Sequence, residues 1–141
     1  MNSIKSSLIL NKLIFDKIEF KRLGFKNSNK IEYELETRLA NNKDNNDVYR
    51  VTLVLSGEKK QEYIFTISLT GYFTFDEKEQ LTERIKTTLI TKNTVAILMP
   101  YLRSQVSLLT AQPEVDCIVL PPFNINRLIE EKEIQKQKKS E

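Results

Sequence analysis

The chain has 141 residues, of which 40% are hydrophobic and 29% charged, with 3 Gly and 4 Pro, so we expect one globular domain rather than a low-complexity chain. The absence of histidine excludes a Ser-His-Asp triad and every His-containing metal site. The single cysteine, Cys117, excludes an intrachain disulfide and a CxxC zinc site, and it fits a reducing compartment, so a cytoplasmic protein is expected.

The first 30 residues hold the basic bias of the chain, with seven Lys and Arg against two acidic residues. Such a cluster can contact nucleic acid or an anionic membrane, or it can be the solvated face of a strand, which we favour. The longest apolar run, residues 95–99, is far shorter than the roughly 20 residues that a membrane-spanning helix needs. No membrane insertion is therefore expected.

Four segments of the first half alternate apolar and polar residues with the period of two that is typical of half-buried strands. The first, residues 13–23, places Ile14, Ile18 and Phe20 on one face. The second begins at residue 31 and separates apolar from charged residues cleanly. Its apolar face holds Ile31, Tyr33, Leu35 and Leu39, and its charged face holds Glu32, Glu34, Glu36 and Arg38.

Turn-forming residues separate the next two strands. Asn and Asp side chains gather over residues 41–47, where they favour a turn because they hydrogen-bond their own backbone. A third strand follows and ends in an expected turn over residues 56–60. The fourth runs from Tyr63 to Phe75, and Gly71 indicates a bulge or a close backbone approach within it. Short connections between four such strands predict an antiparallel sheet with one solvated face.

The second half changes to helical spacing. Apolar residues four apart predict a helix within residues 76–90, and a longer apolar stripe predicts a helix over residues 93–111, which Pro100 is expected to kink. An extended segment follows, and Asn124 can cap a final helix packed on the same face of the sheet. Strands first and helices after predict an α+β fold with the helices on one face.

The order of these elements and several short motifs resemble the SecB family of bacterial export chaperones. The motifs are ILMPYLR at residues 97–103, PFNINRLI at 122–129, DVYRV at 47–51 and GYF at 71–73. The similarity spans about residues 13–130. The expected organisation is thus an N-terminal arm (1–12), a SecB-like domain (13–130) and a charged tail (131–141).

The resemblance implies an ATP-independent holdase without cofactor or catalysis, which binds unfolded polypeptides in extended apolar grooves and assembles as a dimer of dimers. Clients in the family are export precursors or, for some members, the antitoxin of a toxin-antitoxin pair. Carried over by position, the client-binding residues are Ile31, Tyr33, Leu35, Val115, Ile118, Leu120 and Ile129. The contact between protomers would use Leu98, Leu102, Val106 and Leu109 of the long helix. Core packing is the alternative interpretation of all these side chains.

One departure from the family concerns the translocase motor. The family carries carboxylates for motor docking on the solvated face of the sheet, and the corresponding positions here are Lys17, Lys21 and Thr66. Reversed charges cannot make the same charge-assisted contacts with a basic partner surface. The sequence therefore favours a dedicated client over motor-dependent export.

Two other functions compete with the chaperone interpretation. A small nucleic-acid-binding module could use the basic and aromatic residues Lys17, Phe20, Lys21, Arg22, Phe25 and Lys26. An enzyme could use Glu32, Glu34 and Glu36, which project about 7 Å apart from one strand face. We expect those carboxylates to be solvated charges, and Cys117 to be a buried or idle thiol rather than a nucleophile because no base neighbours it in the sequence.

Overall fold

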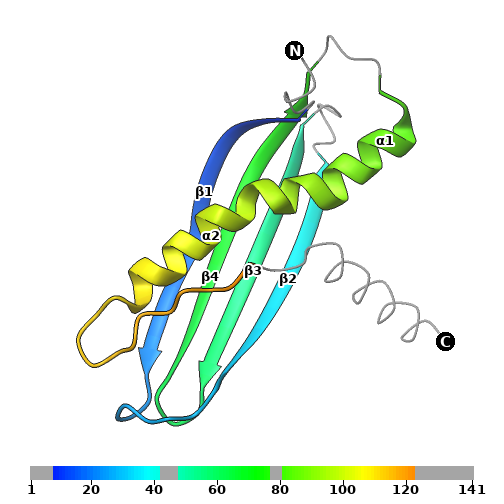
Figure 1. Cartoon of the computed structure of the whole chain (residues 1–141). Coiled ribbons are helices and arrows are strands. Elements are labelled where there is room, and N and C mark those ends of the chain that lie inside the picture. Colours follow the sequence, from blue (N-terminus) through cyan, green and yellow to red (C-terminus); the bar gives the residue numbers. More distant parts are fainter. Residues whose placement is uncertain (1–7, 42–47, 77–80, 123–141) are drawn as a thin grey trace, which may run out of the picture.

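The strands form one antiparallel sheet in the order β1-β4-β3-β2, and a helical segment crosses one of its faces (Figure 1). The computed structural model describes residues 8–41, 48–76 and 81–122. The strands are β1 (Leu8–Arg22), β2 (Ile31–Asn41), β3 (Tyr49–Lys59) and β4 (Tyr63–Phe75). The expected α+β fold, with a four-stranded antiparallel sheet and a long helix, is confirmed.

Strand β1 departs from simple alternation. It begins at Leu8 rather than at residue 13, so residues 8–12, which were expected in a terminal arm, pair with β4. Its register shifts at Asn11 and again at Asp16, and each shift moves the following side chains to the other face. Ile14 consequently lies opposite Thr70 on the face of the sheet away from the helical segment, which we name the open face. The expectation that Ile14 shares a face with Ile18 and Phe20 is wrong because the bulge at Asp16 lies between them.

Two glycines lie where a side chain would collide with the core. Strand β3 continues through Gly57, so the turn expected over residues 56–60 begins only at Lys60. A Cβ at Gly57 would lie 2.2 Å from Cε1 of Phe65 on β4. A Cβ at Gly71 would lie 2.7 Å from Cδ2 of Leu98, which confirms the close approach expected there.

The helical segment comprises α1 (Glu83–Thr88), the π-helical turn η1 (Leu89–Asn93) and α2 (Thr94–Thr110). The two expected helices thus follow each other directly, and the long helix over residues 93–111 is confirmed, with Pro100 inside it. In α1, η1 and the first residue of α2, four threonine hydroxyls donate to the carbonyl four residues earlier, a contact that competes with regular α-helical bonding. They are Thr87, Thr88, Thr91 and Thr94.

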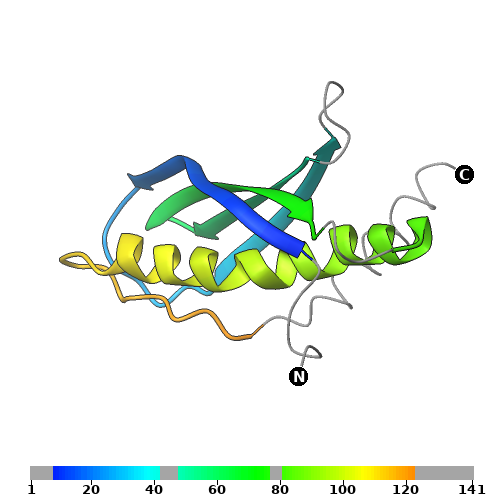
Figure 2. The same cartoon turned by 90° about the horizontal axis from the view of Figure 1, so that it is seen from above.

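The core lies between α2 and the sheet, and Figure 2 shows the helix along one side only. Leu98, Leu102 and Val106 project from α2 and are fully buried. They meet central side chains of β3 and β4 that are also fully buried, namely Leu53, Leu55, Ile67 and Leu69. Burying each such side chain contributes about 1.5–3 kcal/mol, so this layer supplies most of the stability of the fold.

After α2 the chain returns along the same face of the sheet as residues 111–122, which we name the strap (Figures 1 and 2). The helix expected from Asn124 and the charged tail lie outside the described residues. Within the described ranges, every helix is too short or too polar to cross a membrane.

Candidate functional site

An apolar surface continues past α2 onto the edge strand β2. Ile31, Tyr33 and Leu35 lie in register with Lys59, Gly57 and Leu55, so they share the helix side of the sheet. Ile31 and Leu35 are half-buried against the core, whereas Tyr33 is 38% exposed. Leu39, further along the same row, is 54% exposed. This edge therefore presents apolar side chains that the other described residues leave exposed.

Tyr33 stands beside an aromatic platform. The ring of Phe65 occupies the space that a side chain at Gly57 would need, and Tyr33 meets that ring edge-on with centroids 6.5 Å apart. Burial raises the pKa of Tyr33, so its hydroxyl is neutral at physiological pH. The residues Gly57 and Phe65 were missed from the sequence, although a glycine inside an alternating strand was a signal for them.

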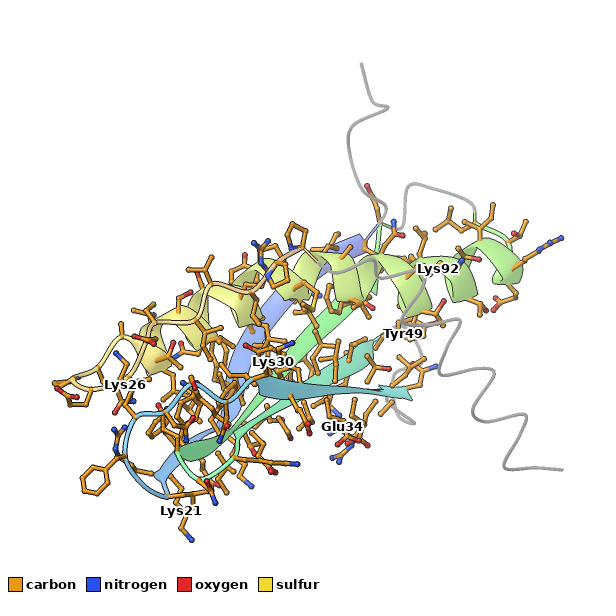
Figure 3. All side chains as sticks on the ribbon, turned by 60° about the horizontal axis from the view of Figure 1, so that its bottom comes forward. Lys21, Lys26, Lys30, Glu34, Tyr49 and Lys92 are labelled. Carbon is orange, nitrogen blue, oxygen red and sulfur yellow. The ribbon has the colours of Figure 1, made fainter. Side chains whose placement is uncertain are left out.

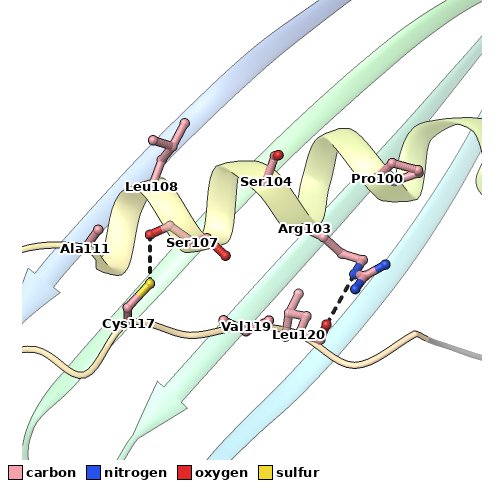
Figure 4. Close-up of a pocket in the computed structure, with 9 residues that line it drawn as sticks. All are labelled: Pro100, Arg103, Ser104, Ser107, Leu108, Ala111, Cys117, Val119 and Leu120. Atoms are coloured by element: carbon pink, nitrogen blue, oxygen red, sulfur yellow. Dashed lines mark hydrogen bonds between the residues drawn. The ribbon is translucent and has the colours of Figure 1, made fainter.

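Hydrogen bonds fasten the strap to α2, and three of them involve Ile118 and Leu120. Ser107 Oγ donates to the Ile118 carbonyl at 2.8 Å, the Ile118 N–H donates to Thr110 Oγ1 at 2.8 Å, and Arg103 Nε donates to the Leu120 carbonyl at 3.2 Å. These bonds turn Ile118 and Leu120 into the core and leave Cys117 and Val119 outside (Figure 4). A groove of about 600 Å³ separates the exposed part of the strap from α2.

A second set of contacts ties the strap to the end of β1. Arg22 Nη2 donates to the Glu114 carbonyl at 2.9 Å, and Lys26 Nζ lies 2.7 Å from Asp116 Oδ1. The hydrogen bond and the charge of Asp116 raise the pKa of Lys26, and those of Lys26 lower the pKa of Asp116. Nothing in the local sequence predicted these contacts, since the two segments lie about ninety residues apart.

The structure separates the expected client-binding residues into two groups. Tyr33 is exposed, while Ile31, Leu35 and Val115 are half-buried at the border of the core. Ile118 and Leu120 are 7% and 1% exposed, so they serve the core of the single chain. Ile129 lies outside the described residues.

The contact expected between protomers involves side chains that the core of the single chain also uses. Leu98, Leu102 and Val106 are fully buried against the sheet, and Leu109 is half-buried beside them. The physical reason is that the apolar stripe of α2 covers the sheet of its own chain. The opposite side of α2 exposes Tyr101 at 45% and Leu108 at 69%.

The open face of the sheet carries the charged residues that the sequence assigned to solvent. Lys17 and Lys21 of β1 lie there, opposite Ser68 and Ile64, and Thr66 lies between those two positions on β4. Lys17 forms an ion pair with Glu19 at 3.5 Å between two exposed side chains. On the other edge of this face the exposed carboxylates are Glu32, Glu34 and Glu36.

The described residues bring together only some of the groups that catalysis or nucleic-acid binding would need. Among the described residues, no group of three or more Cys, Asp or Glu side chains is placed to hold a metal ion. Cys117 is exposed and its thiol contacts the Ser107 carbonyl at 3.4 Å. In the basic aromatic segment, Phe20 packs on Tyr63 with centroids 5.0 Å apart, whereas Phe25 is 92% exposed. One ring of the two is thus used by the core.

One comparison with a solved structure supports the fold. The chain matches the SecB-like chaperone Rv1957 of Mycobacterium tuberculosis, solved with a ChAD peptide from the Rv1956 HigA1 antitoxin, at a TM-score of 0.60 and 18% identity. That match covers 83% of this chain and 91% of the other. The fold is SecB-like.

Two further matches and one negative result complete the comparison. A protein of unknown function from Streptococcus agalactiae matches at a TM-score of 0.49 and 13% identity, over 82% of this chain and 97% of that one. An uncharacterized protein of Methanocaldococcus jannaschii is 25% identical over 117 residues, which are 79% of this chain and 74% of the relative. No family model matches the sequence.

Proposed function

We propose that the chain is an ATP-independent holdase that binds unfolded polypeptide segments along β2 and the adjoining strap. The observation that carries the proposal is Tyr33, which is exposed above the Phe65 ring on an edge strand of a SecB-like fold. An unfolded client offers apolar side chains and unpaired backbone groups. The row of apolar side chains on β2 can contact the apolar groups of the client. The outer edge of β2, over residues 31–40, is not paired with another strand of the described sheet and can pair with the client backbone.

The similar solved structure, Rv1957, supports a polypeptide as the ligand. Rv1957 was solved with an antitoxin peptide, and the apolar surface here is an extended row rather than a closed pocket. A row of this form suits a chain of variable sequence better than it suits a small molecule. The proposal therefore assigns neither cofactor nor catalysis to the protein.

The first experiment measures binding of a permanently unfolded protein, for example one that is reduced and carboxymethylated. We expect Tyr33→Ser to weaken binding about tenfold, because about 1.4 kcal/mol of apolar contact is lost. Tyr72→Ser is the matched control, since Tyr72 lies on the open face in register with Lys12. Fluorescence anisotropy gives both dissociation constants. Equal losses in the two variants, or no binding by the unchanged protein, would contradict the proposed surface.

We also propose that the client is dedicated and that the translocase motor is not bound by the usual route. Lys17 and Lys21 stand on the open face where carboxylates were expected from the family resemblance, and like charges oppose docking of a basic surface. Titration of the purified translocase ATPase should give an affinity weaker than micromolar. Submicromolar binding that survives in Lys17→Ala and Lys21→Ala would show that the motor is bound through other residues.

For self-association we propose the exposed side of α2, which carries Tyr101 and Leu108. The groove between α2 and the strap adjoins this surface and adds apolar area from Pro100 and Val119 (Figure 4). Packing of this side against a second copy would cover exposed apolar side chains without disturbing the core. The number of protomers is measured by light scattering of the protein alone.

A further inference from the structure

The loop between β1 and β2 presents an apolar side chain to solvent. We name residues 23–30 the tip loop. Phe25 at its centre is 92% exposed and Leu23 at its start is 48% exposed. Exposed single apolar residues are common, but an aromatic ring with this exposure on a well-fixed loop buries almost no area against the described part of the chain.

The tip loop is fixed by hydrogen bonds to the β3–β4 turn. The Leu23 and Gly24 N–H groups donate to the Glu62 carbonyl at 2.7 and 3.2 Å, and the Asn27 N–H donates to Glu62 Oε1 at 2.8 Å. The side-chain amides of Asn27 and Asn29 both donate to the Lys60 carbonyl. These bonds hold the backbone on both sides of Phe25. The fixed backbone of the loop therefore holds the ring of Phe25 in its exposed position.

Cationic residues neighbour Phe25 in the sequence. The ten residues 21–30 contain four cations and no acidic residue. Figure 3 shows Lys21 and Lys26 at the same end of the molecule. Lys26 is paired with Asp116, whereas Lys21 and Lys30 make no ion pair with any other described residue. The tip loop thus combines apolar side chains with free positive charge.

This combination fits the surface of an anionic bilayer. An aromatic and an aliphatic side chain can enter the boundary between headgroups and acyl chains, while nearby Lys side chains attract anionic lipids. Single-stranded nucleic acid fits less well, because it needs several rings for stacking and Phe20 is packed on Tyr63. We propose that the tip loop docks peripherally on membranes that contain anionic lipids, through Phe25, Leu23 and the surrounding Lys side chains.

The test is sedimentation with phosphatidylcholine vesicles prepared with and without phosphatidylglycerol. We expect binding only to the vesicles with phosphatidylglycerol, with a decrease when salt is raised. Phe25→Ser should lower the partition coefficient about tenfold, as expected for the loss of one inserted aromatic ring. Ile85→Ser is the control, since Ile85 is 47% exposed on α1, away from the tip loop and from the surfaces proposed for clients and self-association, and it should change binding less than twofold.

The outcomes separate this proposal from the holdase function. Affinity for the unfolded protein should be the same in Phe25→Ser and in the unchanged chain, so failure of one proposal leaves the other measurable. Equal binding to both kinds of vesicle, or equal partition of Phe25→Ser and Ile85→Ser, would overturn the membrane assignment. Loss of vesicle binding together with salt-sensitive, Phe25-dependent binding of a random oligonucleotide would reassign the tip loop to nucleic acid.

Discussion

Glu62→Gln is expected to lower the free energy of unfolding by about 3 kcal/mol, because it leaves the buried ammonium of Lys59 without its counterion. Glu62 is fully buried, and its Oε1 accepts from Lys59 Nζ at 2.9 Å and from the Asn27 N–H at 2.8 Å. Glutamine keeps the size of the side chain and one acceptor oxygen, so the loss of unfolding free energy measures the contribution of the negative charge of Glu62. Urea unfolding measures it, with Glu58→Gln, an exposed neighbour on β3, as the control expected to change stability by less than about 0.5 kcal/mol.

The same carboxylate gives the stability of the fold a defined pH dependence. Burial alone would raise the pKa of Glu62, but the hydrogen bonds from Lys59 and Asn27 and the charges of Lys59 and Arg22 outweigh burial and lower it from 4.5. A lowered pKa in the folded state stabilises the protein above the unfolded value and loses that contribution as the pH falls through the folded value. The difference between the unchanged protein and Glu62→Gln should shrink below about pH 4.5. A constant difference down to pH 3 would contradict this account.

The strands and the long helix could be predicted because local periodicity records which face is buried. Alternation located β2, β3 and β4, and the stripe through Leu98, Leu102 and Val106 located α2. The bulge at Asp16 could not be found in this way, since it depends on how β1 pairs with β4. The position of the β3–β4 turn was missed for a related reason, because Gly57 serves the Phe65 ring and not a turn.

The candidate site was predicted in part. Family resemblance selected Tyr33, which the structure exposes, but it also selected Ile118 and Leu120, which the core buries. A sequence motif shows that a side chain is apolar, but only the folded structure shows whether that side chain is buried or exposed. The contacts of the strap with Arg22 and Lys26 depend on segments distant in sequence, so no local pattern could indicate them.

The sequence alone cannot tell whether the apolar stripe of α2 packs in the core of one chain or between two protomers. A helix uses the same spacing of apolar residues against its own sheet and against a second helix. Leu102→Ala should lower the free energy of unfolding by about 2–5 kcal/mol, since the side chain is fully buried between α2 and the sheet. If the residue serves the core of one chain, this loss does not change with protein concentration. Chemical denaturation at two protein concentrations separated by a factor of about 100 tests the point.

Leu108→Ala is the matched variant on the opposite side of the same helix. Leu108 is 69% exposed, so its removal should change the stability of the single chain by less than about 0.5 kcal/mol. If this side of α2 is the surface of self-association, the variant should instead weaken assembly, which light scattering over a dilution series measures. The opposite result would be a loss of stability in Leu102→Ala that depends on protein concentration, together with normal assembly of Leu108→Ala. It would show that the stripe through Leu102 forms the contact between protomers, which requires α2 to separate from the sheet of its own chain.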